Sequence, residues 1–426
     1  MPTFSAHRRP LRVLLPTLGS AGDVHPMIAL GLALRARMHR VTIVTNPLFK
    51  SLIERHGLEF LPVGTIADAY AAIADPDLWH PRKGFAVVAR RVIVPAIAEI
   101  YRLIKTHADA DTVVAASAIA LGARVAQEKL GVPTATVHLQ PIIIRSLLDQ
   151  GFAGTFRISA SQPMWLRRAL FRLADWAVID RELKRPLNAF RAALGLVRVD
   201  RVLRHWVHSP QCVIGFFPEW FAAPQTDWPA HTHLVGFPLW DGDDTAGSAA
   251  QAEEFFNAGE PPVIFTPGSA GSTMHQYFLE SVDAAHRLGV RAMLVTNFPE
   301  QLPRALPCGV KAFGYLPFSQ VLRRAALLVY HGGIGTLAQA INAGIPQLVV
   351  PNGHDQFDNA WRIEQLRLGR SIAQQRYRSD RAAEAIRAIL GDGALKQRAR
   401  EYAARIDSPT ALKLACELIE GLAIRS

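Results

Sequence analysis

The sequence predicts an α/β protein made of two Rossmann-like domains that face each other across a cleft. Its 426 residues exceed what a single hydrophobic core usually fills. Short apolar runs with strand character alternate with helical patterns in both halves, which is typical of parallel sheets with crossover helices. The tetrapeptide GSAG follows the first predicted strand of each half, at residues 19–22 and 268–271. This internal repeat favours two related halves over one extended sheet.

The N-terminal half begins with a βαβ pattern whose crossover should be right-handed. Its predicted elements are a strand at 12–16, a helix at 26–37, and strands at 41–45, 112–116, 134–137, 213–216 and 233–236. A polar run rich in Gly, Ala and Ser follows from residue 241 and has the composition of a linker. The predicted boundaries are therefore an N-terminal domain at 1–240, a linker at 241–260, a C-terminal domain at 261–408 and a last helix at 409–426.

Residues 330–360 carry the strongest functional signal. A predicted strand ends at His331, a glycine turn follows, and a helix opens at Thr336. Glycines between a strand and a helix let backbone N–H groups approach an anion, which the helix dipole also favours. An ordinary tight turn would need the same glycines, but a polar cluster follows the next strand, where ligands bind in open α/β sheets. We predict a phosphate-binding site here.

Asp23 lies after the first predicted strand, where a side chain can project into the cleft. A carboxylate there can accept a proton from an attacking hydroxyl, or it can simply cap the following helix. His25 is a second candidate base because histidine titrates nearest neutral pH. The sequence thus offers two bases for proton transfer in the first loop.

Composition bounds the class of protein. The chain is 50% hydrophobic and 19% charged, as in well-packed globular proteins. Its net charge of +11 is spread through the sequence, which suits an anionic ligand or membrane surface better than nucleic acid. Three distant cysteines show no metal-ligand spacing, and no apolar run approaches the roughly 18 residues of a membrane span. We expect a cytoplasmic protein, with peripheral contact at the inner face of the membrane left open.

Two N-terminal segments are candidates for acceptor binding. Residues 164–187 place Leu166, Leu170 and Leu173 at helical spacing beside arginines. Such a helix can rest on an anionic membrane or guard an apolar channel, but it can equally be a solvated helix packed on its domain. Trp79 and Phe85 can line an acceptor pocket or belong to the core.

The sequences HGGIGT at 331–336 and HDQ at 354–356 resemble the donor-binding signature of the nucleotide-sugar glycosyltransferases with the GT-B fold, the UDP-glycosyltransferase (GT1) family. The resemblance implies a GT-B fold whose last helix returns to the N-terminal domain. It also implies that His331 and the glycine-turn amides bind the diphosphate, while Asp355 and Gln356 hold sugar hydroxyls. The residues that it assigns to the donor are Gly22, Ser269, Tyr315, Leu316, His331, Gly332, Gly333, Gly335, Thr336, Asp355, Gln356 and Asn359. Among them, Tyr315 would stack on the nucleobase, Leu316 would contact the base edge, and Ser269 would donate to a phosphate oxygen.

The family places its catalytic base in the first loop, and Asp23 falls at that position. In the members that use His, an Asp near a later strand orients the ring, and residues 113–120 contain no carboxylate. The resemblance therefore implies that Asp23 is the base and that His331 stabilises the leaving diphosphate. His25, Trp79, His138 and Gln140 are the expected acceptor-side residues. Because no Asp-x-Asp-like pair lies beside the phosphate site, we expect neither a metal nor another cofactor.

Residues 208–242 and the segment DPDLWHP more narrowly resemble bacterial rhamnosyltransferases that attach rhamnose to a hydroxyacyl lipid. The expected function is inverting transfer of a hexose or deoxyhexose from a nucleotide sugar, dTDP-rhamnose in the first place, to an apolar acceptor. A UDP-glucose-type transferase acting on another lipid or small aglycone is the alternative. An NAD-dependent oxidoreductase is disfavoured because the first loop lacks G-x-G-x-x-G and the second strand ends in Thr45 and Asn46, without the acidic ribose ligand. A non-catalytic partner protein would have lost Asp23 or His331, and both are present.

Overall fold

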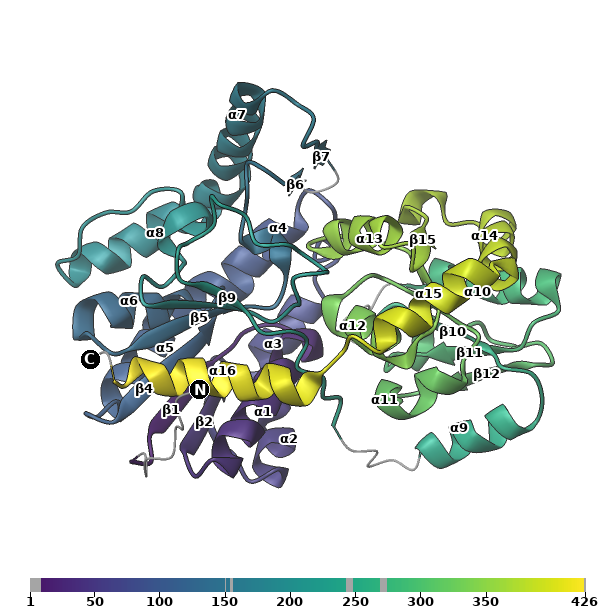
Figure 1. Ribbon diagram of the computed structural model, residues 1–426, viewed down its shortest axis with the longest axis horizontal. Helices are drawn as coiled ribbons and strands as arrows, with labels where there is room; N and C mark the ends of the chain where they lie inside the picture. Colours follow the sequence, from purple (N-terminus) through teal and green to yellow (C-terminus); the bar gives the residue numbers. More distant parts are fainter. Residues whose placement is uncertain (1–8, 150, 154–155, 243–247, 269–273, 425–426) are drawn as a thin grey trace.

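A computed structural model describes residues 9–149, 151–153, 156–242, 248–268 and 274–424. It has two parallel sheets, each covered by helices on both faces, in two domains that lie side by side (Figure 1). Strands such as β4 are buried at every position, as expected where helices cover both faces of a parallel sheet. The fold is the predicted pair of Rossmann-like domains.

The N-terminal sheet has seven strands within the described residues, in the order β3-β2-β1-β4-β5-β8-β9. These strands are β1 (Arg12–Pro16), β2 (Arg40–Thr45), β3 (Glu59–Pro62), β4 (Thr112–Ser117), β5 (Thr134–His138), β8 (Cys212–Gly215) and β9 (Thr232–Leu234). A separate antiparallel hairpin pairs β6 (Gly151–Ala153) with β7 (Phe156–Ile158). The helices of this domain are α1 (Ala21–Ala36), α2 (Lys50–Arg55), α3 (Ile66–Ile73), α4 (Gly84–Val88), α5 (Val94–His107), α6 (Leu121–Leu130), α7 (Met164–Ala174) and α8 (Asp180–Ala193). Helix α1 begins earlier than predicted, so that Asp23 lies in its first turn rather than in a loop.

The C-terminal sheet repeats the same order with six strands among the described residues, β12-β11-β10-β13-β14-β15. They are β10 (Val263–Thr266), β11 (Ala292–Val295), β12 (Val310–Phe313), β13 (Leu327–Tyr330), β14 (Gln347–Val349) and β15 (Gly369–Ser371). The helices are α9 (Ser248–Asn257), α10 (His275–Leu288), α11 (Phe318–Val321), α12 (Ile334–Ala343), α13 (Gln356–Gln365), α14 (Ser379–Gly391), α15 (Gly393–Ala403) and α16 (Ser408–Leu422). In each domain the order reverses beside the first strand, at β1/β4 and at β10/β13. Ligands bind in open α/β sheets at the carboxyl ends of strands around this reversal.

Part of the predicted linker belongs to the C-terminal domain by its packing. Helix α9 places Phe255 edge-on against Phe313 of β12, with 6.1 Å between ring centroids. The guanidinium of Arg291 donates to the backbone oxygen of Phe255 and lies over its ring. The apolar side chains of α9 thus pack against the C-terminal domain and extend its hydrophobic core.

The last helix returns to the N-terminal domain, as the resemblance implies. Helix α16 lies along α1 and the N-terminal sheet and is drawn in yellow across the first domain in Figure 1. Near its end Glu420 accepts hydrogen bonds from Arg37 Nε at 2.6 Å and Nη2 at 2.9 Å, and it lies 3.0 Å from His39 Nε2. This ion pair fixes the end of the chain to the first domain.

Replacing Glu420 by Ala should lower the free energy of unfolding by about 2 to 3 kcal/mol, because a buried His39 and the Arg37 guanidinium lose their partner. Burial alone would raise the pKa of Glu420, but hydrogen bonds from Arg37 and His39 outweigh burial and leave it below the usual value. The contribution is therefore present above pH 4.5 and is lost as the pH falls through the lowered folded-state pKa. Urea unfolding of both proteins at pH 7 and at a series of pH values below 4.5 measures this. Equal stability of the wild type and Glu420→Ala at pH 7 would contradict it.

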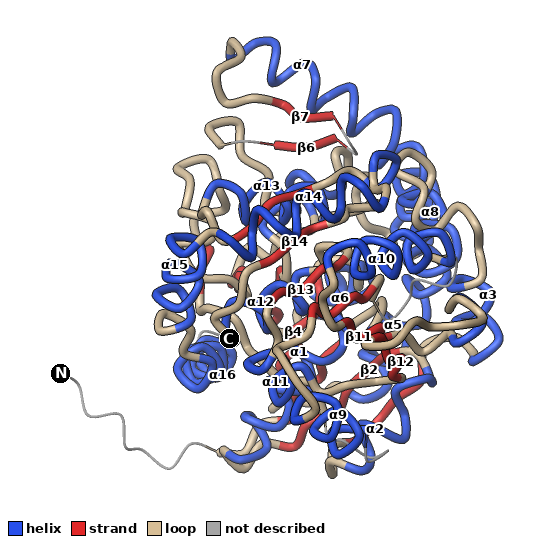
Figure 2. The backbone as a smooth tube through the Cα atoms, turned by 90° about the vertical axis from the view of Figure 1, so that its right-hand side faces the viewer, coloured by secondary structure: helices blue, strands red, loops and turns tan. Residues whose placement is uncertain are grey.

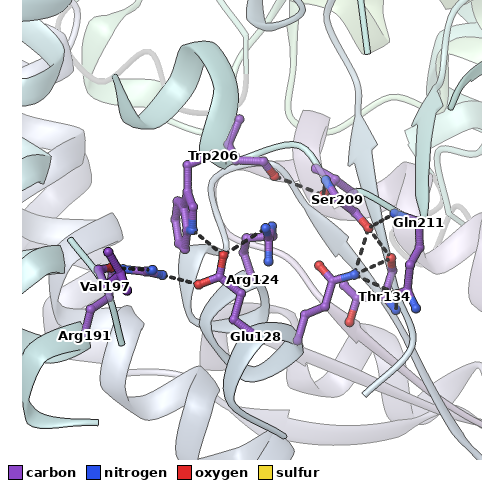
Figure 3. Close-up of polar contacts among 11 residues, drawn as sticks. Arg124, Glu128, Thr134, Arg191, Val197, Trp206, Ser209 and Gln211 are labelled. Atoms are coloured by element: carbon purple, nitrogen blue, oxygen red, sulfur yellow. Dashed lines mark hydrogen bonds and ion pairs between the residues drawn. The ribbon is translucent and has the colours of Figure 1, made fainter. Parts of the chain in front are cut away.

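A polar network braces the outer side of the N-terminal domain (Figure 3). Glu128 of α6 accepts hydrogen bonds from Trp206 Nε1 at 2.9 Å and from the guanidinium of Arg191 in α8, and it pairs with Arg124. Arg191 also lies over the Trp206 ring. The network holds α8 against α6. Because α8 follows α7 in the chain, the network also fixes the point from which α7 extends.

Within the described residues, no helix has both the length and the apolar character that crossing a bilayer requires.

Candidate active site

A cleft of about 1350 Å³ opens between the two domains at the carboxyl ends of β1, β10, β13 and β14. The loops after these strands supply polar groups from opposite sides. The two walls approach closely near α1 and α12, where a Cβ built on Gly335 would lie 3.7 Å from the Cα of Gly22. The sheets therefore place the two predicted halves of the site in one cavity.

Asp23 lines the cleft from the first turn of α1. Its carboxylate accepts the backbone N–H of Ser20 at 2.9 Å and a hydrogen bond from the side chain of Gln140. Burial raises the pKa of Asp23 to about 6, although these hydrogen bonds partly oppose the shift. The residue thus braces the helix start and also presents a carboxylate of near-neutral pKa to the cavity.

Three of the four predicted acceptor-side residues line the cleft, and one does not. His25 lies edge-on to Trp240, with 5.2 Å between ring centroids, and burial lowers the pKa of His25 to about 4. Trp79 and Gln140 line the cavity as well. The prediction for His138 is wrong: it is fully buried and bonds His208, with 3.1 Å between ring nitrogens. His138 shares one face of β5 with Thr136, and that face packs against residues 207–209 rather than the cleft.

His331 follows β13 and lies between two glycines. A Cβ on Gly333 would come within 2.4 Å of His331 Nε2, and one on Gly268 within 2.6 Å of Cε1. Burial lowers the pKa of His331 to about 4, so the ring is neutral at pH 7, and its buried Nδ1 has no protein partner among the described residues. Gly333 also begins α12 without a side-chain cap, which leaves the first amides of this helix available to an anion.

Gly333→Ala should displace the imidazole and weaken nucleoside diphosphate binding at least tenfold. The backbone of Gly333 has φ −64°, which alanine adopts without strain, so the effect is a collision with His331 and not a folding defect. Calorimetric titration measures the affinity, and thermal unfolding checks the fold. Gly391→Ala, where nothing lies within 4 Å of the added Cβ, is the matched control. Unchanged affinity in Gly333→Ala would contradict this placement of His331.

Some residues of the polar turn after β14 line the cleft, and others hold the lining residues in place. Asp355 lines the cleft, and burial together with the nearby charge of Asp23 raises the pKa of Asp355 to about 7. Gln356 also lines it, with its side-chain oxygen held by the backbone N–H groups of Asn352 and Gly353 at 2.8 and 3.2 Å. Asp355 and Gln356 are thus presented on a turn that is fixed from behind.

Asn359 departs from its predicted contact with the donor. It is fully buried and does not line the cleft. Its amide nitrogen donates to the carboxylate of Asp355 at 2.7 Å and to the backbone oxygen of Gly332 at 2.9 Å. Gly332 likewise does not line the cleft. Its φ of +94° turns the chain toward α12. Asn359 therefore positions Asp355 and ties it to the glycine turn.

The remaining donor-side predictions fall on the far wall. Tyr315 lines the cleft, half-exposed, and its hydroxyl donates to the backbone oxygen of Asp241. Leu316 is buried beside it, and Gly335 and Thr336 line the cavity from α12. Ser269 lies outside the described residues. The sequence did not point to Asp241, which also accepts the backbone N–H of Ser319 at 2.7 Å and so ties the end of the first domain to this wall.

One wall of the cleft is apolar. The sequence pattern indicated its helix but not its hairpin. This wall is formed by the hairpin β6/β7, by α7 and by the π-helical turn η4 (Asp175–Ile179) that continues α7; their lining residues are Phe152, Phe156, Ile158, Leu170, Leu173, Ala174, Ala177, Val178 and Ile179. The loop after β14 closes the opposite side, where His354 Nε2 lies 3.0 Å from the backbone oxygen of Leu78 and its ring meets Trp79 edge-on. The cavity thus has a polar end at His331 and an apolar end at α7. Among the described residues, no three His, Cys, Asp or Glu side chains are grouped to hold a metal ion.

Two protein-family models match the chain. Residues 13–147 match the glycosyltransferase family 28 N-terminal domain, and residues 287–420 match the erythromycin biosynthesis protein CIII-like C-terminal domain. The O-mycaminosyltylonolide 6-deoxyallosyltransferase of Streptomyces fradiae is 29% identical over 96% of this chain and 97% of its own length.

Solved structures share the fold. The glycosyltransferase VinC in complex with dTDP has a TM-score of 0.68 at 20% identity, over 98% of this chain and 100% of the other. The spinosyn rhamnosyltransferase SpnG has a TM-score of 0.65 at 21% identity, over 96% and 99% of the two chains. With a family 28 type N-terminal domain, a CIII-like C-terminal domain and the GT-B fold, the chain is a GT1-like glycosyltransferase.

Proposed function

We propose that the protein transfers a deoxyhexose from a dTDP-sugar, dTDP-rhamnose in the first place, to the hydroxyl of a hydroxyacyl lipid with inversion at the anomeric carbon. The observation that carries the proposal is the shared cavity. Asp23 from the first domain and Asp355 from the second are near enough for the charge of Asp23 to raise the pKa of Asp355. The diphosphate-type site at α12 lies on the same cavity wall as Asp355. Asp23, Asp355 and the start of α12 therefore surround one volume, and we assign to them the roles of base, sugar-binding carboxylate and anion site.

The chemistry is a single displacement. The acceptor hydroxyl oxygen forms a bond to the anomeric carbon while the bond from that carbon to the diphosphate oxygen breaks. Asp23 takes the hydroxyl proton, and the diphosphate leaves with the bonding electron pair. Donors fixed where negative charge develops stabilise such a transition state most. Here they are His331 and the amides at the start of α12, with Ser269 as an expected further donor. These groups supply the stabilisation without a required metal in our proposal.

The donor and acceptor classes rest on separate observations. A deoxyhexose is supported by the named activity of the Streptomyces fradiae relative, a 6-deoxyallosyltransferase, and the dTDP carrier by the dTDP complex of a structural neighbour. An apolar acceptor is supported by the wall of α7, η4 and the hairpin, which holds aliphatic and phenylalanine side chains. We place the reaction in the cytoplasm, with contact at the inner face of the membrane as part of the proposal.

The test is an assay of purified protein with a hydroxyacyl lipid and either dTDP-rhamnose or UDP-glucose, read by mass spectrometry. The expected result is acceptor plus one deoxyhexose from dTDP-rhamnose, unchanged by a chelator. Transfer from UDP-glucose alone would replace the donor that we propose and retain the reaction class. Loss of transfer with chelator would refute metal independence. No transfer from either donor to any apolar hydroxyl would refute the proposal.

A further inference from the structure

An arm of the N-terminal domain projects beyond the rest of the molecule. Helix α7 and the hairpin β6/β7 stand above both domains in two perpendicular views (Figures 1 and 2). The arm continues through η4 into α8, which is held to α6 by the network around Glu128. Its position is therefore fixed at the base, while its outer face meets solvent.

The outer face of α7 and η4 carries large apolar side chains in a regular pattern. Trp165, Leu173 and Trp176 are 70%, 57% and 73% exposed. Residues at spacings of three, four, seven and eight share one side of a helix, so these three lie together with the exposed Arg168 and Arg172. We refer to these five residues as the outer face. Scattered exposed apolar residues are ordinary, but two tryptophans and a leucine on one helix side mark an interaction surface.

The side of the same helix opposite the outer face is packed against the domain, so the exposed apolar residues are not a second set of core residues. Phe171 is buried against Gly151 of the hairpin, and its ring lies 5.6 Å from the Arg145 guanidinium carbon. The Arg167 guanidinium donates to the backbone oxygen of Asp149, and Asp175 forms an ion pair with Arg145. The helix is thus pinned on one side, and the apolar pattern on the other serves contact with something else.

The charge of the outer face selects the partner. Arg168 and Arg172 lie between the tryptophans, and in the described part of the chain neither forms an ion pair with an acidic side chain. Arg157 is exposed on the adjacent strand β7, next to the exposed Phe156. Tryptophan favours the boundary between lipid tails and headgroups, and arginine extends its charge to anionic headgroups. The net charge of +11 adds a long-range attraction of the same sign.

The outer face is continuous with the apolar end of the cleft. Leu173 and Val178 are both exposed to solvent and among the residues that line the cavity. We propose that the outer face of α7 and η4, with Phe156 and Arg157, docks the protein on an anionic lipid bilayer, so that an apolar acceptor enters the cleft past Leu173 and Val178 without crossing water. The docking surface stands on its own observations, and the entry route rests on the proposed function.

The test is co-sedimentation of the full chain with phosphatidylglycerol-containing or pure phosphatidylcholine vesicles. We expect binding to the anionic vesicles, little to the neutral ones, and release at high salt because charges are then screened. Arg168→Glu with Arg172→Glu should reduce binding on the order of tenfold or more. Trp165→Ser with Trp176→Ser should do the same and should remove the blue shift of tryptophan fluorescence that bound wild type shows.

The matched control is Arg381→Glu with Arg387→Glu on α14, which makes the same charge change on exposed residues of the other domain and should bind as wild type. The proposal would be overturned if the wild type did not co-sediment with anionic vesicles. It would also be overturned if an outer-face variant bound these vesicles as well as the wild type does. A dimer in ultracentrifugation that Trp165→Ser with Trp176→Ser abolishes would overturn it too, because the face would then belong to a second copy.

Activity separates this proposal from the proposed function. Outer-face variants should transfer sugar to an acceptor in detergent micelles at the wild-type rate and lose transfer to the same acceptor in vesicles. Equal losses in both would refute the entry route. Vesicle binding by a protein that transfers no sugar in either format would leave the docking surface intact and refute the proposed function.

Discussion

Asp23→Asn should reduce kcat about 10² to 10⁴-fold and leave donor binding nearly intact, because the amide cannot accept the acceptor proton. The side chain keeps its shape and its place beside Ser20 and Gln140. Folding should not suffer. Burial raises the pKa of Asp23 to about 6, which means that the ionised carboxylate is costly in the folded state at pH 7 and that a neutral replacement is no less stable. Transfer rates and calorimetric donor titration of the same preparation measure both effects.

The same carboxylate predicts a pH profile. The base must be ionised, so kcat/KM should rise with pH through about 6 and level off above it. A profile that falls as the pH rises through this range, or an Asp23→Asn variant with more than a tenth of wild-type kcat, would exclude Asp23 as the base. His25→Ala tests the other candidate base. Burial lowers the pKa of His25 to about 4, and removing this side chain should alter the KM for the acceptor more than kcat.

His331→Ala should weaken nucleoside diphosphate binding at least tenfold and lower kcat by about 10² to 10³. The ring is neutral at pH 7, since burial lowers the pKa of His331 to about 4, and it can then donate one N–H to a phosphate oxygen. A bound diphosphate favours the protonated ring, so binding should be accompanied by proton uptake as the pH falls toward 5.

Calorimetric titrations with dTDP, UDP and NADH test this expectation. Repeating them in two buffers with different ionisation enthalpies measures how many protons are taken up on binding. His275→Ala is the control, because His275 bonds the backbone oxygen of Gln301 in the same domain and does not line the cleft. If the His331→Ala protein binds diphosphate as tightly as wild type, the anion site lies elsewhere. If NADH binds and neither diphosphate does, the reaction class is wrong.

Much of the site was predictable because its residues follow strands in the sequence. Parallel strands place their carboxyl ends at one edge, so His331 after β13 and Asp355 after β14 had to be neighbours. The repeated GSAG sequence similarly indicated that Gly19 and Gly268 occupy equivalent places after the first strand of each half. These inferences needed only strand order and turn chemistry.

Other features depended on information that sequence patterns do not contain. His138 is the last residue of β5 and packs against His208, whereas Gln140 lies beyond the end of the strand and lines the cleft, and the sequence pattern alone does not locate that strand end. Asn359 follows Asp355 by one helical turn, which permits their hydrogen bond, but only the packed structure shows that this bond replaces a contact with the donor. The π-helical turn at Asp175–Ile179, through which α7 continues into α8, is likewise a backbone feature that the apolar spacing of the sequence does not predict.

We propose that one direct displacement occurs in the cleft between Asp23 and the anion site at the start of α12. The most direct test is the configuration of the new glycosidic bond, measured by NMR on the product of a reaction with a donor of known anomeric configuration. A single displacement with Asp23 as the base predicts the opposite configuration in the product. A product with the donor's configuration would require a second nucleophile and would contradict the mechanism.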